Sequence, residues 1–298
     1  MTGAWSRAQN LAPAAPIVFV VLWSSAFIAA RAGLPHVSPL LFLAARFVLA
    51  TALLSAVCLV WKQDWSGMGR RWPHFVVAGI LINGLYLSGA FVAMTHITGA
   101  TMALVGSLHP LLTALLSGPL LGDRFRPSQW LGFACGVGGV ALVAGVRLGD
   151  LAEVEGMALG AAATASLVLG TLYYSKHCKG APLVASNTVQ LAGASAVTLA
   201  LMFALETPRA EWTPEVLVAL VYLAAVVSVG GMALFLLMLK TGTAGKVAAN
   251  FYLTPCVTAL LGWLVLGEGL SRAAIAGFVL ASAGVWLVNR KGPAANAS

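Results

Sequence analysis

Two titratable side chains, Arg46 and His109, lie inside long apolar runs of the sequence and are the first candidates for chemistry. A charge at the centre of a membrane helix costs about 2.5–3.5 kcal/mol on insertion scales, so Arg46 must face protein or water. Its guanidinium could bind a substrate carboxylate through two parallel hydrogen bonds, or it could bind backbone carbonyls and fix helix packing. His109 directly precedes Pro110. It could carry or sense a proton near neutral pH, or stay neutral and bond a backbone group freed by the proline.

Four further polar side chains form two pairs at helical spacing. Asn83 and Tyr86 are three residues apart, as are Asn187 and Gln190. Residues at this spacing share one face of a helix. Each pair could offer hydrogen bonds to the ammonium and carboxylate groups of an amino acid, or it could hold neighbouring membrane helices together.

Three polar residues stand shortly before prolines in apolar runs. Ser107 precedes Pro110, and both Asn250 and Tyr252 precede Pro255. A proline removes one backbone hydrogen bond and can kink a helix, so freed carbonyls and these side chains could face a cavity. The alternative is a kink that serves packing alone.

Trp23 and Phe27 are four residues apart and share a helix face. They could form an aromatic wall for a flat apolar substrate or a cation, or pack against a neighbouring helix or lipid. With them the predicted substrate-binding set is complete. It comprises Trp23, Phe27, Arg46, Asn83, Tyr86, Ser107, His109, Asn187, Gln190, Asn250 and Tyr252.

Patterns typical of enzymes and metal sites are missing from the sequence. It contains no P-loop, H-E-x-x-H or G-x-S-x-G motif, and its four cysteines include no C-x-x-C pair. Ser107 and His109 are two residues apart, so on a helix they point to different faces and make a poor catalytic dyad. We therefore expect no catalytic residue, no metal ligand and no cofactor, and we do not expect an enzyme.

The composition indicates a membrane protein. Of 298 residues, 60% are hydrophobic and 9% are charged, and the mean hydropathy is +0.91. Soluble domains carry about 25% charged residues, and so few charges could not keep a surface wetted by water. The net charge of +8 comes from Lys and Arg dispersed between apolar runs. Nucleic-acid binding requires a clustered basic patch, so we expect membrane lipids and a small-molecule substrate as partners, and no nucleic acid.

The apolar runs predict an all-α integral membrane fold with ten transmembrane helices, since each span needs roughly 20 apolar residues. The predicted spans are 14–31, 39–61, 75–94, 101–121, 128–146, 156–175, 183–205, 214–239, 247–266 and 273–288. With the N-terminus in the cytoplasm, twelve of the 17 Lys and Arg residues fall on the cytoplasmic side and four on the other. This excess predicts that both termini lie in the cytoplasm. We expect the membrane to be the bacterial inner membrane.

An internal repeat indicates duplication. The segment 111–122, LLTALLSGPLLG, matches 256–267, CVTALLGWLVLG; each follows a proline and precedes an acid, at a constant offset of 145 residues. Five spans per copy is an odd number, so the second copy enters the membrane from the opposite side. The sequence therefore predicts two inverted-topology five-helix repeats, 1–150 and 151–298, an arrangement found in many secondary transporters.

The chain resembles the EamA-like family of the drug/metabolite transporter superfamily. The residues that carry the resemblance are 23–27 (WSSAF), 43–47 (LAARF), 109–111 (HPL) and 255–268. Within the superfamily the chain is most similar to YddG-type exporters of aromatic amino acids. The resemblance implies ten helices in two inverted repeats around a central cavity near mid-membrane. The fifth helix of each repeat would lie at the periphery, and the activity would be export of amino acids or related metabolites.

Several alternatives stay open at this point. The substrate could instead be a drug cation, a nucleoside or a sugar conjugate, and the protein could be a channel or, with less support, an intramembrane enzyme. Glycines at G-x-x-x-G spacing (118 and 122, 132 and 136, 156 and 160) allow close helix contact and favour internal packing over dimerisation. A monomer is therefore the working expectation. The leading hypothesis is a secondary transporter that works by alternating access.

Overall fold

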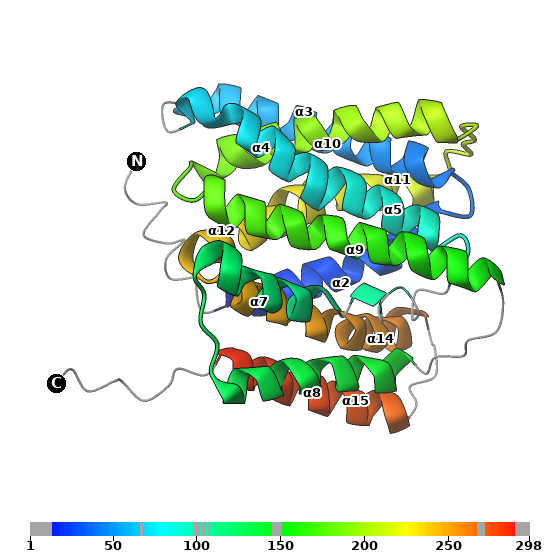
Figure 1. The fold of residues 1–298 in the computed structure, drawn as a ribbon. Helices are drawn as coiled ribbons and strands as arrows, with labels where there is room; N and C mark the ends of the chain where they lie inside the picture. Colours follow the sequence, from blue (N-terminus) through cyan, green and yellow to red (C-terminus); the bar gives the residue numbers. More distant parts are fainter. Residues whose placement is uncertain are drawn as a thin grey trace.

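A computed structural model of the chain describes residues 14–65, 68–97, 102, 105–106, 108–144, 151–266 and 272–289. Over these residues the chain is helical throughout (Figure 1), apart from turns and one isolated antiparallel bridge between Val37 and Ala210. The absence of strands in this part of the chain agrees with the all-α fold predicted from the sequence.

The described residues form helical elements in both halves of the chain. Its first half contains α2 (Ala15–Gly33), α3 (Pro39–Val60), η1 (Gly69–Arg71), α4 (Trp72–Gly79), η2 (Ile80–Leu85), α5 (Tyr86–Ala93), α7 (Leu108–Leu121) and α8 (Pro127–Ala144). Its second half contains α9 (Leu151–His177), α10 (Leu183–Leu205), α11 (Pro214–Val221), η3 (Tyr222–Gly231), α12 (Met232–Thr241), α13 (Ala244–Ala249), η4 (Asn250–Tyr252), α14 (Leu253–Leu266) and α15 (Arg272–Asn289).

Six helical stretches in the described residues are long and apolar enough to cross a membrane. They are Pro39–Val60, Gly69–Ala93, Val154–His177, Leu183–Leu205, Pro214–Thr241 and Ala244–Val265, with lengths of 22 to 28 residues. Each overlaps a span predicted from the sequence, with ends that agree to within three residues except that Gly69–Ala93 begins six residues before the predicted start at 75. The other predicted spans contain shorter helical segments, so the total of ten spans stays a prediction.

Two of the long helices contain a π-helical segment in their middle. The six-residue η2 separates α4 from α5, and the ten-residue η3 separates α11 from α12. A π-helical turn widens the helix and displaces backbone carbonyls from the regular pattern, and such turns often lie at functional sites. Shifting 80–85 by the repeat offset of 145 residues gives 225–230, which lies within η3.

The long helices are layered across the bundle (Figure 1). The pair α3 and α10 packs at one edge, the pair α8 and α15 packs at the opposite edge, and α2, α7, α9 and α14 lie between them. Small residues bring α8 and α15 into close contact. A Cβ atom built on Gly139 would lie 2.6 Å from the backbone nitrogen of Ala281, a distance that only glycine tolerates.

The apolar residues divide into an interior and an outward-facing set. The main core is formed by α2, α3, α4–α5, α9, α10 and α11–α12, and a second core joins α7, α8, α13–α14 and α15. Many large apolar side chains face outward, among them Leu59, Phe203 and Val265, each more than 60% exposed. An outer surface this rich in apolar side chains suits contact with lipid rather than water.

Candidate functional site

Arg46 lies in the interior of the bundle without a carboxylate partner. Its side chain is on α3 and is 4% exposed, and its Nε atom donates a 2.9 Å hydrogen bond to the Ser228 hydroxyl in η3. Within the described part of the chain no Asp or Glu carboxylate forms an ion pair with Arg46. A buried cation without a counter-ion has lost most of its hydration, so it binds a visiting anion strongly.

Asn187 meets the same short stretch of η3. Its Nδ2 atom donates to the backbone carbonyls of Ser228 at 3.3 Å and Val229 at 3.4 Å, while its Oδ1 atom is buried with no hydrogen-bond partner. Both carbonyls lie in the π-helical segment η3, where backbone carbonyls depart from the regular α-helical pattern, and that of Val229 also accepts from the Met232 backbone. Arg46, Asn187 and Ser228, from three different helices, together form what we call the Arg46 cluster. The structure therefore brings two of the predicted site residues together.

Ser228 was not among the residues predicted from the sequence. The signal that could have found it is the repeat itself, because Ser228 stands 145 residues after Asn83, which was in the predicted set. Asn83 lies in η2 as Ser228 lies in η3, and its Nδ2 atom is buried without a hydrogen-bond partner. Both π-helical segments thus carry a buried polar side chain at the same position of the repeat.

The segment around η2 packs tightly against α10. A Cβ atom on Gly79 would lie 2.1 Å from the carbonyl oxygen of Gln190. The Gln190 side chain donates from Nε2 to the Ser186 hydroxyl one turn earlier, at 3.0 Å, and its Oε1 atom is buried with no hydrogen-bond partner. Tyr86 is buried in the same core. Gln190 thus adds an unpaired polar atom to the helix that carries Asn187, and Asn83 adds another in η2, which packs against α10.

A second group surrounds His109. Its ring is 1% exposed, its Nε2 atom lies 3.4 Å from the Thr171 hydroxyl, and its Nδ1 atom has no hydrogen-bond partner. The ring also stands edge-on to Phe251, with centroids 4.9 Å apart. His109 is therefore held between α7, α9 and η4 rather than exposed to water.

Phe251 belongs to a set of four mutually packed rings, here termed the aromatic cluster. Its members are Phe19, Trp23, Phe235 and Phe251. Ring centroids lie 5.3 to 6.4 Å apart in tilted, stacked and edge-on arrangements, geometries that contribute about 0.5–1.5 kcal/mol per pair beyond burial. Trp23 was predicted from the sequence and its three partners were not. The cluster fills the space beside the N-terminal half of α2.

Beyond the aromatic cluster, α2 carries a run of partly exposed residues. Residues 25–29 are all partly exposed, including Phe27, which packs against the main core. The Ser25 hydroxyl lies 2.6 Å from the Tyr222 hydroxyl in η3. Phe27 thus lies on the same helix as the aromatic cluster but beyond it.

The remaining three residues of the predicted set are Tyr252, Asn250 and Ser107. Tyr252 is fully buried against α8, where a Cβ atom on Gly136 would lie 2.3 Å from its ring. Asn250 donates from Nδ2 to the Val247 carbonyl of its own helix at 3.0 Å. Ser107 lies outside the described residues. The Tyr252 hydroxyl is buried with no hydrogen-bond partner, and a role of Tyr252 or Asn250 in substrate binding stays a prediction.

The described interior offers hydrogen-bonding groups and one cation to a ligand. It combines one cation with unpaired amide and imidazole atoms on α3, η2, α7 and α10. Among the described residues no group of three or more His, Cys, Asp or Glu side chains could hold a metal ion. Such an interior can hydrogen-bond a small zwitterion or anion with little water present.

Comparison with known proteins places this interior in context. The model of the EamA-like transporter family matches the chain twice, over residues 13–145 and 154–290. The uncharacterized transporter YvbV of Bacillus subtilis is 25% identical and covers 94% of this chain and 92% of its own length. Protein PecM of Dickeya dadantii is 27% identical, with coverage of 87% and 85%. The uncharacterized inner membrane transporter YedA of Escherichia coli K12 is 25% identical, with coverage of 89% and 87%.

A solved crystal structure matches with a TM-score of 0.78 at 23% identity, covering 94% of this chain and 97% of the other.

Proposed function

Because the chain belongs to the EamA-like transporter family and is an integral membrane protein, we propose that it exports small carboxylate-bearing metabolites, aromatic amino acids in particular. The observation that carries the proposal is Arg46, a buried cation oriented by Ser228 with no carboxylate near it in the described part of the chain. A substrate carboxylate would supply the missing counter-charge. Unpaired amides on η2 and α10 would hydrogen-bond its ammonium and carboxylate groups.

The proposed architecture has ten spans in two inverted repeats, 1–150 and 151–298. Three observations support it: the family model matches each half separately, the π-helical segments lie at equivalent positions, and Asn83 and Ser228 correspond. The packing is also matched, because α3 contacts α10 and α8 contacts α15, each pair combining equivalent spans of the two halves. Inverted repeats of this kind are typical of secondary transporters with a site at mid-membrane.

The proposed mechanism is alternating access, with both termini in the cytoplasm. In this orientation the aromatic cluster closes the cytoplasmic half of the path beside α2. On the opposite side the bridge between Val37 and Ala210 joins the loop after α2 to the loop after α10. Rocking of the two halves would open one closure while the other stays shut, so substrate reaches Arg46 from one side at a time.

The test is substrate counterflow in proteoliposomes loaded with unlabelled substrate, with and without a pH gradient. The panel contains phenylalanine, tyrosine, tryptophan and other amino acids, together with a drug cation, a nucleoside and a sugar conjugate. We expect saturable uptake of labelled aromatic amino acids, lost in Arg46→Gln and partly kept in Arg46→Lys. Flux of the cation or nucleoside but of no amino acid would contradict the proposed substrate class. Flux without saturation or counterflow would contradict the carrier mechanism.

A further inference from the structure

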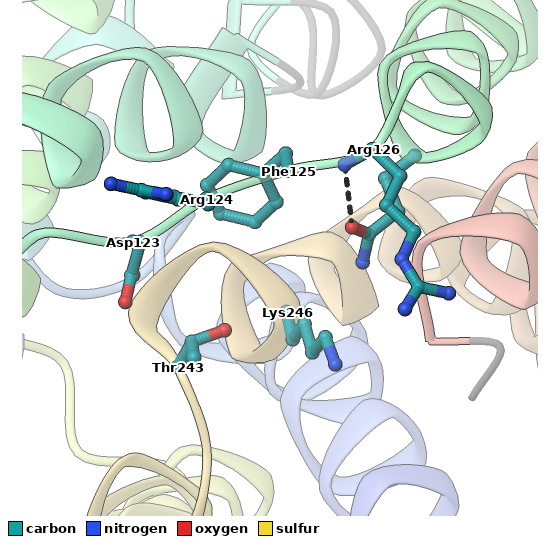
Figure 2. A pocket seen from close by; sticks show the side chains of 7 residues that line it. Asp123, Arg124, Phe125, Arg126, Thr243 and Lys246 are labelled. Atoms are coloured by element: carbon teal, nitrogen blue, oxygen red, sulfur yellow. Dashed lines mark hydrogen bonds between the residues drawn. The ribbon is translucent and has the colours of Figure 1, made fainter. Parts of the chain in front are cut away.

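A basic cavity lies where the loop between α7 and α8 meets the first turn of α13 (Figure 2). Its volume is about 230 Å³, several times the roughly 30 Å³ that a water molecule occupies in the liquid. The residues that line it are Asp123, Arg124, Phe125, Arg126, Gln129, Thr243 and Lys246. None of them belongs to the Arg46 cluster, so this is a separate site.

The charge of the lining is strongly positive. Arg124, Arg126 and Lys246 contribute three positive charges and Asp123 one negative charge. Within the described residues none of the three cations forms an ion pair. In Figure 2 the charged ends of Arg126 and Lys246 lie on the side of the cavity away from Asp123. The N-terminus of α8 lies beside the cavity, because α8 begins at Pro127. The helix dipole therefore adds partial positive charge there. A lining with this excess of positive charge favours an anionic ligand.

Specific contacts hold the loop that forms the cavity. Gln129 is buried; its Oε1 atom accepts a 3.0 Å hydrogen bond from the Arg126 backbone, and its Nε2 atom donates to the Val288 carbonyl at 2.7 Å. Phe125 packs edge-on against Phe133, with centroids 5.5 Å apart. These contacts fix the backbone of the loop on α8 and α15, which places the exposed Arg124 and Arg126 and the half-buried Lys246 around one cavity.

The location of the cavity indicates which anion reaches it. It lies at the end of the outer pair α8 and α15, whose outward side chains are apolar, with Leu131 at 59% exposed. Acyl chains can lie along this surface while the headgroup meets the loop. We propose that the cavity binds the phosphate of an anionic phospholipid headgroup, with Arg126 and Lys246 as the principal ligands. The proposal does not depend on which substrate is transported.

The experiment measures binding of phosphatidylglycerol to the purified full-length protein in detergent by native mass spectrometry. Phosphatidylcholine with the same acyl chains and inorganic phosphate are the comparison ligands. A Lys or Arg near an anionic lipid contributes about 1 kcal/mol, so Arg126→Gln and Lys246→Gln should each weaken phosphatidylglycerol binding about fivefold. Asp123→Asn removes a negative charge that repels the anionic headgroup, so it should strengthen phosphatidylglycerol binding. Arg70→Gln, an exposed cation outside the cavity, is the matched control and should change binding less than twofold.

The outcomes separate the alternatives. Preference for phosphatidylglycerol over phosphatidylcholine, with opposite effects of Arg126→Gln and Asp123→Asn, supports the proposal. Equal weakening by Arg70→Gln would overturn it, since general surface charge would then explain binding. Competition by inorganic phosphate at concentrations similar to the lipid would also overturn it, in favour of a site for soluble phosphate. If Arg126→Gln does not fold, Arg126→Lys should keep binding within about twofold because it preserves the charge, while Lys246→Gln still tests the loss.

Discussion

The Nε atom of Arg46 donates a 2.9 Å hydrogen bond to the hydroxyl of Ser228, and this bond connects α3 with the π-helical segment of the third helix of the second half. The backbone carbonyl of Ser228 also accepts from Asn187 on α10. One residue of η3 thus orients both polar side chains of the Arg46 cluster. The bond fixes the guanidinium without neutralising it, which is what a site for an anionic substrate needs.

Ser228→Ala should lower the stability of the protein and weaken its binding of a carboxylate substrate. A hydrogen bond to a charged group contributes about 1.5–3 kcal/mol, so the free energy of unfolding should fall by about that amount. The Michaelis constant for a carboxylate substrate should rise because Arg46 loses its orientation. Ser228→Thr keeps the hydroxyl and serves as control. Wild-type melting and transport in Ser228→Ala would mean that the bond has no such role.

The sequence predicted most of the helical ranges because membrane helices require long apolar runs, and the six longest helices follow those runs. It did not predict η2 and η3, since a π-helical turn uses the same apolar residues as an α-helix and differs only in hydrogen-bond register. Arg46 and Asn187 became candidates because polar residues are rare in such runs, and their role in binding stays a prediction. Which of the other polar residues would meet could not be foreseen: Tyr252 turns toward Gly136, and that depends on helix rotation, which composition does not encode.

Gly139→Ala should destabilise the contact between α8 and α15, whereas Gly138→Ala on the same helix should not. A Cβ atom at position 139 would lie 2.6 Å from the backbone nitrogen of Ala281 and from the carbonyl oxygen of Gly277, and backbone atoms cannot give way easily. A Cβ atom at position 138 would meet the Leu280 side chain at 3.5 Å, an ordinary contact. Overpacking of this kind costs about 1–3 kcal/mol. Thermal unfolding in detergent would show the difference, and equal melting temperatures for the two variants would contradict it.

Cys178 should make the protein less stable at alkaline pH. Burial raises the pKa of its thiol to about 12, above the ordinary value of about 8.5 that it regains on unfolding. Between these values the unfolded chain releases a proton that the folded chain keeps, so the free energy of unfolding falls as pH rises. Cys178→Ala should reduce this slope between pH 9 and pH 11 in denaturation experiments. A slope equal to that of the wild type would show that the thiol does not contribute.

A disulfide between Val37→Cys and Ala210→Cys should stop transport reversibly. These residues form an isolated antiparallel bridge, and opposed residues in such a bridge have Cα atoms about 4.5–5.5 Å apart, within the range that a disulfide spans. If the two halves rock, this bridge must open in every cycle, so oxidation should abolish counterflow and a thiol reductant should restore it. Each single cysteine variant, oxidised in the same way, is the control for damage to Cys58, Cys135, Cys178 and Cys256. Full transport by the cross-linked protein, with the bond verified by mass spectrometry, would exclude opening at this bridge as a step of the cycle.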